Sequence, residues 1–213
     1  EYPHEHQAVR QFLRDMFENF GHDPEPYWVL GNLKVFGSEI DLAVIKRNGI
    51  AIMELKQWDT PVRGGETDTW YTPESDSTHR KPMIAGKYDN PFQQVRDYRY
   101  KLISFLDRHK GEFLNGKPAR QIALDHIDAY VVLCPQRPED TDTKPEAGVH
   151  PNKWWGGVVG MNALYREVRT PSARLRLKDQ EIRKLIEGPM ALQEESLALW
   201  VPLDKLPSAD APS

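Results

Sequence analysis

The stretch "GSEIDLAVIKRNGIAIMELK", residues 37–56, predicts a β-hairpin that carries a cluster of charged residues among apolar ones. Two apolar, β-branched runs flank Asn48-Gly49, a dipeptide typical of a tight type I′ turn. With this dipeptide as the loop, Asp41 would pair with Lys56. Residues that pair directly, and residues two apart on one strand, share a face of the sheet. We therefore expect Asp41, Glu54 and Lys56 on one face, at the end of the hairpin away from the turn.

The electrostatics of this cluster favour a bound cation. Two carboxylates about 5 Å apart repel each other by roughly 3 kcal/mol at an effective dielectric constant of about 20. A divalent ion offsets this repulsion more fully than one lysine does, and it takes oxygen ligands readily. The alternative is a structural ion pair between Asp41 and Lys56, with Glu54 at a solvated edge of the sheet.

Polar residues of two predicted helices favour the metal site. Apolar spacing predicts a helix over residues 4–20, and Glu5 falls on its apolar face, where an unpaired carboxylate is costly. A second helix is expected from Pro91, with Gln94 and Tyr98 on its inner stripe. Glu5 could instead be a solvated first-turn residue, and Gln94 and Tyr98 could simply cap the core. We interpret the three residues together as parts of one shared site.

The order of the predicted elements indicates a mixed α/β fold, a central mixed sheet flanked by helices. In chain order they are a helix (4–20), a strand (27–35), the hairpin (39–56), a helix (91–111), a strand (126–134), a strand at "WWGGVVGM" and a short helix at "KDQEIRKLIEG". We expect a single domain over residues 1–213, with a long insertion at 57–90 and a C-terminal extension from about residue 150. Insertions of this length are often lids or binding segments.

Composition excludes several classes of protein. With 213 residues, 39% of them hydrophobic, the chain can bury a substantial core. The lone Cys134 excludes a disulfide framework and a cysteine zinc cluster, and it fits a reducing cytoplasm. No apolar run is long enough to span a membrane, and the first residues do not resemble a signal peptide, so we expect no membrane partner.

The charge and the start of the chain carry two further expectations. A net charge of −4 lacks the basic surplus of a domain that coats DNA, but it does not exclude a domain that holds a metal with its own carboxylates, because those acids lower the net charge. The chain begins without Met, so we expect it to be trimmed or to be a piece of a larger protein.

Asp41 followed by Glu54-Leu55-Lys56 resembles the D…ExK signature of the PD-(D/E)XK nuclease superfamily. Within that superfamily the chain is most similar to the NERD (nuclease-related) domain, over roughly residues 1–134. The similar stretches are "HEHQAVRQFL", "SEIDLAVIKRNGIAIMELKQW", the Gly64-Gly65…Trp70 segment and "NPFQQVRDYRYKL". Two features depart from the family: the 57–90 connection is long, and His4 stands where the family favours Gly. The resemblance implies a restriction-endonuclease-like core.

The resemblance also implies metal-dependent hydrolysis of DNA phosphodiester bonds. The implied ligands of Mg²⁺ or Mn²⁺ are Asp41, Glu54, Glu5 and the carbonyl of Leu55. Lys56 would orient the attacking water and stabilise charge on the phosphate. Gln94 would steady the water or the Lys56 end of the site, and Tyr98 could contact a phosphate.

Residues of the insertion are further candidates for substrate binding. Arg63, Arg80 and Lys81 could clamp the substrate backbone. Aromatic residues could stack on unpaired bases, or could instead anchor the long loop; they are Trp58, Trp70, Tyr71, Trp154 and Trp155.

NERD domains commonly accompany helicase or kinase partners, so the resemblance implies a module of a DNA-processing or phage-defence protein. The alternative is a catalytically silent module of the same fold that binds nucleic acid or a partner protein.

Overall fold

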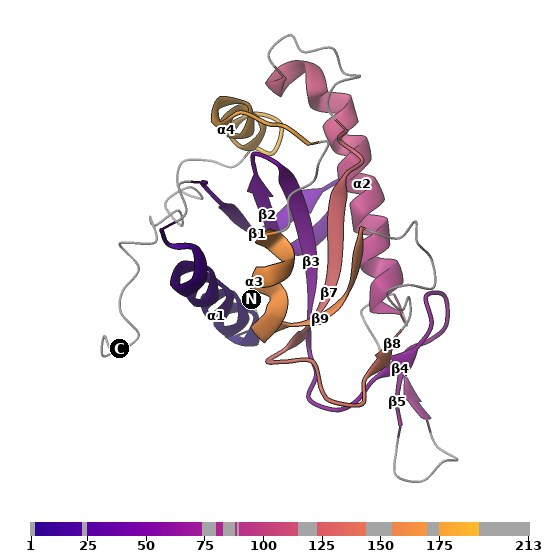
Figure 1. Cartoon of the computed structure of the whole chain (residues 1–213). Helices are drawn as coiled ribbons and strands as arrows, with labels where there is room; N and C mark the ends of the chain where they lie inside the picture. Colours follow the sequence, from indigo (N-terminus) through magenta and orange to yellow (C-terminus); the bar gives the residue numbers. More distant parts are fainter. Residues whose placement is uncertain are drawn as a thin grey trace.

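A mixed five-stranded sheet, in the order β1-β2-β3-β7-β9, forms the centre of the computed structural model (Figure 1). The structure describes residues 3–22, 25–73, 80–82, 88, 90–114, 123–143, 155–169 and 175–191. Strands β1 (Trp28–Val35), β2 (Ser38–Lys46) and β3 (Gly49–Gln57) form an antiparallel meander. Strands β7 (Ile127–Cys134) and β9 (Gly156–Gly160) then extend the sheet in parallel with β3.

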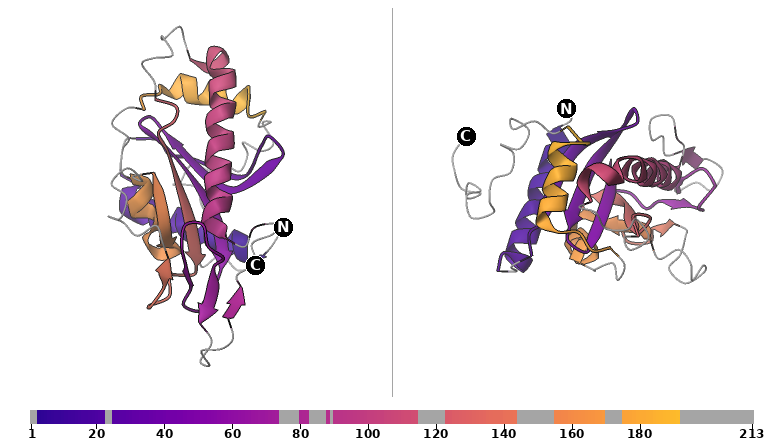
Figure 2. Two further views of the ribbon diagram at one scale, coloured as in Figure 1. Left: turned by 90° about the vertical axis from the view of Figure 1, so that its right-hand side faces the viewer. Right: turned by 90° about the horizontal axis from the view of Figure 1, so that it is seen from above.

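Helices cover both faces of this sheet (Figures 1 and 2). Helix α2 (Pro91–Phe113) packs on one face, and helices α1 (Pro3–Phe20) and α3 (Met161–Arg169) pack on the other. Helix α4 (Asp179–Glu187) lies on the α2 side, against the C-terminal half of that helix. Within the described residues, no helix is long and apolar enough to cross a membrane.

Strand β3 shows why the sheet is covered on both sides. Side chains of a strand alternate between its faces, and nearly every residue of β3 is buried. Ile50 and Ile52 belong to the core beneath α2, whereas Ala51 and Met53 belong to the core beneath α1 and α3. The predicted mixed α/β architecture with a helix-flanked central sheet is confirmed.

Several element boundaries differ from the prediction. Gly111 does not end the second helix, which continues to Phe113 and is capped at Leu114. A single glycine inside a helix lowers its stability but does not by itself end it. The "WWGGVVGM" strand gives way at Met161 to helix α3, which the prediction missed. The apolar face of α3 is short, so its period is hard to separate from that of a strand.

The described part of the 57–90 insertion contributes to a second, small sheet in the order β6-β5-β4-β8. Its strands are β4 (Arg63–Gly64), β5 (Tyr71–Pro73), β6 (Arg80–Pro82) and β8 (Asp142–Thr143). Strand β8 follows β7 in the chain, so the insertion pairs with a segment about 80 residues away. Figure 1 places this sheet near the N-terminal end of α2.

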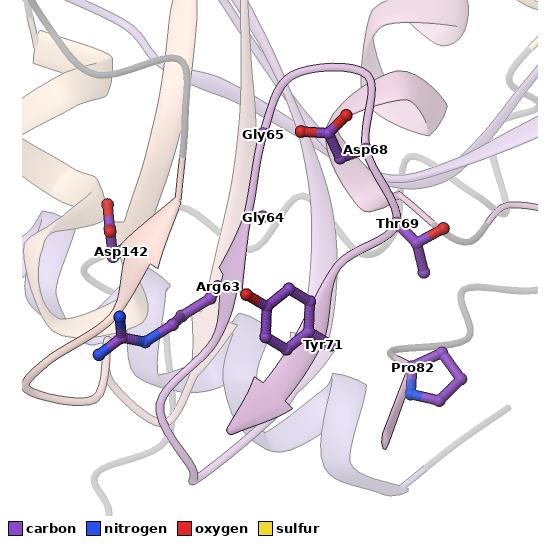
Figure 3. Close-up of a pocket in the computed structure, with 8 residues that line it drawn as sticks. All are labelled: Arg63, Gly64, Gly65, Asp68, Thr69, Tyr71, Pro82 and Asp142. Atoms are coloured by element: carbon purple, nitrogen blue, oxygen red, sulfur yellow. The ribbon is translucent and has the colours of Figure 1, made fainter. Parts of the chain in front are cut away.

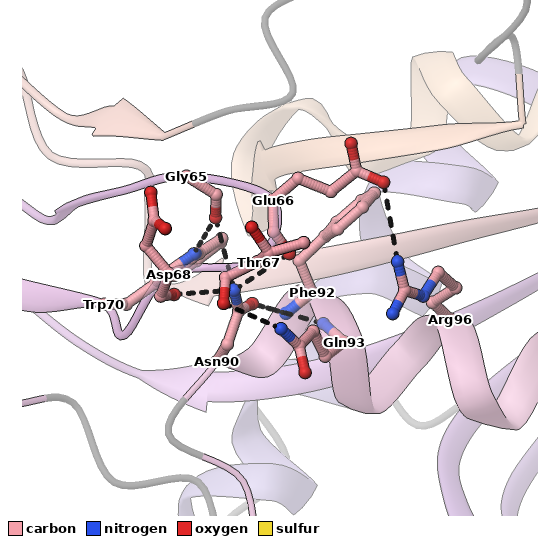
Figure 4. Close-up of polar contacts among 9 residues, drawn as sticks. All are labelled: Gly65, Glu66, Thr67, Asp68, Trp70, Asn90, Phe92, Gln93 and Arg96. Atoms are coloured by element: carbon pink, nitrogen blue, oxygen red, sulfur yellow. Dashed lines mark hydrogen bonds and ion pairs between the residues drawn. The ribbon is translucent and has the colours of Figure 1, made fainter.

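Asn90 joins the small sheet to α2 (Figure 4). It is fully buried and caps the helix, since its Oδ1 accepts hydrogen bonds from the backbone N–H groups of Phe92 and Gln93. Its Nδ2 lies 2.8–3.2 Å from the carbonyl oxygens of Gly65, Glu66 and Asp68, and donates to them. One side chain thus fixes both the start of α2 and the loop between β4 and β5.

We expect Asn90→Ala to lower the free energy of unfolding by about 2–4 kcal/mol, because it removes a helix cap and leaves buried carbonyls without a donor. Asn90→Asp keeps the cap but sets a carboxylate oxygen against three carbonyls, so it should destabilise the fold at least as much. Urea unfolding at pH 7 measures both.

Asn19→Ala is the matched control, because the exposed Asn19 donates one hydrogen bond to the carbonyl of Asp15. Its effect should stay below about 0.5 kcal/mol. An Asn90→Asp chain as stable as the wild type would show that the contacts to the loop contribute nothing.

Candidate active site

Asp41 lies where strands β2 and β3 separate. The ladder between them ends at the pair Leu42–Met53, and Asp41 is the next residue of β2. Its Oδ2 accepts a hydrogen bond from the backbone N–H of Leu55 at 2.7 Å. A backbone donor of β3 is therefore satisfied by a side chain of β2, just past the point at which backbone pairing stops.

The turn of this hairpin lies one position earlier than predicted. Lys46 pairs with Gly49, so Arg47 and Asn48 form the loop, and neither has the positive φ of a type I′ turn. Gly49 instead leaves space for the Lys46 side chain, since a Cβ at position 49 would lie 2.9 Å from Cε of Lys46. Lys46 is buried, and its Nζ donates a hydrogen bond to the Arg169 carbonyl.

The corrected register changes the partner of Asp41 but not its face. If the observed register is extended by one pair beyond Leu42–Met53, Asp41 lies opposite Glu54. The prediction had placed Asp41 opposite Lys56. The pairing moves by two residues, and a shift by an even number leaves every side chain on its original face. The prediction that Asp41, Glu54 and Lys56 share a face is consistent with the register.

Glu54 is a buried carboxylate in the central strand, 3% exposed. Its Oε1 accepts hydrogen bonds from Nζ of Lys56 and, at 2.7 Å, from Nε2 of Gln94. Its Oε2 is buried and has no hydrogen-bond partner in the described part of the chain. The part of the alternative that placed Glu54 at a solvated edge of the sheet is therefore wrong, because Glu54 is buried in the central strand and forms an ion pair with Lys56.

The surroundings of Glu54 disfavour its negative charge. Burial raises its pKa from 4.5 to about 7, and the charge of Asp41 adds to the rise. The charge and hydrogen bond of Lys56, and the hydrogen bond of Gln94, act in the opposite direction without cancelling it. Glu54 thus favours a proton or a further cation beside it.

These groups fit a hard divalent cation. Asp41 and Glu54 supply two carboxylates, and the buried, unpartnered Oε2 of Glu54 is the kind of atom that such an ion would bind. The N–H and C=O of one strand residue point to the same side, so the Leu55 carbonyl points toward Asp41. No three His, Cys, Asp or Glu side chains cluster among the described residues. Glu5 is in α1, and its side chain lies outside the described part.

Helix α2 brings its predicted polar residues to the carboxylates. Nε2 of Gln94 donates to Glu54 and also, at 2.8 Å, to Oη of Tyr98. Burial raises the pKa of the Tyr98 hydroxyl, and the charges of Glu54 and Asp41 add to the rise. Gln94 and Tyr98 are therefore a hydrogen-bonded pair at the edge of the carboxylate site.

Two residues near the site were missed by sequence reasoning. Oη of Tyr88 donates to Oδ2 of Asp97 at 2.8 Å. Burial raises the pKa of Tyr88 to about 12, and the charges of Asp97 and Glu54 contribute. Asp97 lies three residues after Gln94, so helical spacing could have found it. Tyr88 precedes the helix in a segment without periodicity, and no sequence signal marks it.

The residues proposed to bind substrate fall in different places. Arg63 is exposed on β4 and lines a pocket of the small sheet (Figure 3). Arg80 and Lys81 are in β6, and their side chains lie outside the described part. Trp70 and Trp155 are buried and are not available to stack on bases. Tyr71 lines the same pocket as Arg63, and Trp154 lies outside the described residues.

Glu54 makes the stability of the metal-free protein depend on pH. Its pKa is raised in the folded state, so the folded chain keeps a proton that the unfolded chain has lost between about pH 4.5 and 7. Stability should fall as pH rises through this window, by up to about 3 kcal/mol for this one group. Glu54→Gln mimics the protonated form and removes the effect.

We therefore expect the wild type to lose stability relative to Glu54→Gln between pH 5 and pH 8, measured by urea unfolding in EDTA. The comparison cancels other groups, such as Asp128, whose pKa burial also raises to about 7. A difference between the two chains that does not change with pH would contradict the assignment.

Comparison with known proteins agrees with this arrangement. The family model of the nuclease-related domain, NERD, matches residues 2–134, which include both strands of the hairpin, the small sheet up to β6, and α2. Searches of curated proteins and of solved structures found no significant match. Because the match spans more than half of the chain, this protein belongs to the NERD family of nuclease-related domains.

Proposed function

We propose that this domain is a metal-dependent nuclease that hydrolyses DNA phosphodiester bonds. The observation that carries the proposal is that Asp41 and Glu54 are close enough, where β2 and β3 separate, for the charge of Asp41 to raise the pKa of Glu54. Glu54 also has an unpartnered oxygen among the described residues, and Lys56 lies beside it. Membership of the nuclease-related family supports the same class of reaction.

Asp41 and Glu54 would hold Mg²⁺ or Mn²⁺, with the Leu55 carbonyl and Glu5 as further ligands. A bound divalent ion would polarise a phosphoryl oxygen and lower the pKa of water. Asp41 is oriented for this role by the Leu55 N–H, which binds one of its oxygens. Gln94 and Lys56 both bind Oε1 of Glu54, which keeps Oε2 as the oxygen available to a ligand.

Lys56 would be the cation that acts on the substrate. Its side chain is 18% exposed, whereas the Glu54 side chain is 4% exposed, so the ammonium is the more accessible partner of the pair. There it would orient the attacking water and stabilise the negative charge that develops on the phosphate. Tyr98 would contact a phosphate oxygen from the rim of the site.

The wider context follows from the resemblance. Partnership with a helicase or a kinase, and a role in phage defence, are proposals of this kind. A cytoplasmic location is also a proposal, supported by the buried free thiol of Cys134.

We expect the wild-type chain to convert supercoiled plasmid to nicked and linear forms with Mg²⁺, and not with EDTA. Asp41→Ala and Lys56→Ala should each lower the rate at least about 100-fold, because each removes a charge that acts on the transition state. Gel analysis of a time course measures the rate.

Asp59→Ala and Lys34→Ala are matched controls, since both residues are exposed and outside the site. They should cleave like the wild type. Equal cleavage by all five chains would refute the assignment, and tight DNA binding without cleavage under any divalent ion would favour the catalytically silent module.

Gln94 should act as a positioning residue. Its hydrogen bond lowers the pKa of Glu54, so Gln94→Ala should raise that pKa further and leave less ionised Glu54 at neutral pH. We expect the acid limb of the pH–rate profile to move to higher pH, with a larger loss at pH 6 than at pH 8.5.

Gln93→Ala is the control for this shift, because Gln93 donates to the Thr67 carbonyl instead of to Glu54. Its profile should keep the wild-type midpoint. A loss of rate in Gln94→Ala that is equal at every pH would contradict the positioning role.

A further inference from the structure

One face of the small sheet carries a row of side chains that the proposed catalytic site does not use. Tyr71 pairs with Arg63 and with Pro82, and Arg63 pairs with Asp142. Directly paired residues share a face, so Pro82, Tyr71, Arg63 and Asp142 follow one another across the four strands. Adjacent strands are about 4.8 Å apart, so the row spans roughly 14 Å.

This row lines a pocket of about 680 Å³ (Figure 3). Its other lining residues are Gly64, Gly65, Asp68 and Thr69. A volume of this order is typical of pockets that hold small organic ligands, and a nucleotide is within that range. The pocket is therefore large enough for one nucleotide.

The wall of the pocket is held rigidly by α2 (Figure 4). Asn90 binds the carbonyls of Gly65, Glu66 and Asp68, and Gln93 binds that of Thr67 at 3.0 Å. Four consecutive carbonyls are thus tied to the first turn of the helix. A pocket whose wall is fixed in advance loses little conformational entropy when a ligand binds.

The two aromatic residues of this segment have different surroundings. Trp70 is fully buried beneath the loop, with its indole N–H bonded to the Gly65 carbonyl at 2.8 Å. A Cβ on Gly64 would lie 2.3 Å from Cδ1 of Trp70, so the glycine makes room for the indole. Tyr71, the next residue along β5, lines the pocket. A ligand in the pocket can therefore contact Tyr71.

The charges of the pocket suit a nucleobase better than a phosphate in its interior. Asp68 and Asp142 are acceptors that would repel a phosphate but would bind the amino groups of a base. Arg63 is exposed, and within the described residues no group pairs with its guanidinium. Arg63 can therefore take the phosphate of a nucleotide whose base lies on Tyr71.

We infer that this pocket binds an unpaired nucleotide of the substrate strand, with its base stacked on Tyr71 and its phosphate at Arg63. A base within a duplex is stacked on both faces and paired along one edge, so it cannot enter the pocket. Asn90 and Gln94 are one helical turn apart, which sets the pocket wall beside the residue that binds Glu54. The inference rests on the proposed function and specifies its substrate: DNA that is single-stranded next to the cleavage site.

Fluorescence anisotropy with the full chain in EDTA tests the inference without cleavage. The probes are a labelled single strand of about 16 nucleotides, a strand of the same length with abasic sites throughout, and the corresponding duplex. We expect the base-bearing strand to bind about 5- to 150-fold more tightly than the abasic strand, and more tightly than the duplex. Tyr71→Leu should lose this preference for bases, whereas Tyr71→Phe should keep it.

Arg63→Ala is an independent test at an exposed position, so it does not depend on the folding of the Tyr71 variants. It should weaken binding to both strands and reduce the dependence of log K on log salt by about 0.7, the value for one phosphate contact on a single strand. Arg14→Ala, at an exposed arginine of α1, should leave both quantities unchanged.

Equal binding of the base-bearing and abasic strands, equal binding of single strand and duplex, or a preference for bases that survives in Tyr71→Leu would overturn the inference. An unchanged salt dependence in Arg63→Ala would do the same. Plasmid cleavage by a chain that fails these binding tests would leave the proposed nuclease function standing. If the chain binds strands in a base-dependent way but never cleaves DNA, the proposed nuclease function is refuted and the nucleotide-binding pocket is supported.

Discussion

The hydrogen bond between the Asp41 carboxylate and the Leu55 N–H is the contact on which the site depends. In a continuing ladder, this N–H would bind a backbone carbonyl of β2. Asp41 takes over as acceptor just past the last backbone pair, so the strands can separate without leaving a buried donor unsatisfied. The separation sets two carboxylates from neighbouring strands side by side. The structural and the proposed chemical roles of Asp41 therefore come from one geometry.

Burial gives the second carboxylate its character. Glu54 lies in the middle of the sheet, and one lysine does not compensate for its desolvation and for the charge of Asp41. The hydrogen bonds from Gln94 and Lys56 go to the same oxygen and leave the other without a described partner. A site with this excess of buried negative charge favours a proton or a cation. The metal ion proposed for this site would therefore compete with that proton.

Helix α2 couples this site to the small sheet. Its cap residue Asn90 holds the loop between β4 and β5, and Gln94, one turn later, holds Glu54. A rigid helix links the two contacts, so the pocket lined by Tyr71 keeps a fixed relation to the carboxylates. Figure 1 shows the same relation at the level of the fold: the small sheet lies near the end of α2 at which the helix begins.

The sequence by itself determined which residues could share a face. Alternation in the hairpin grouped Asp41 with Glu54 and Lys56, and helical spacing grouped Gln94 with Tyr98, because both periods are local properties of the backbone. These face assignments remain correct although the turn was predicted one position too late, since a register shift of two residues changes partners but not faces.

The same reasoning could not predict that β8 would pair with β4, or that Gly49 would lie beneath Lys46. Pairing between distant strands depends on which unpaired strand edges lie next to each other in the folded chain, and the local sequence does not specify this. Only the tertiary structure decided that Lys56 pairs with Glu54, that Asn90 holds a loop, and that Tyr71 lines a pocket while Trp70 is buried, because each follows from contacts between segments far apart in the chain.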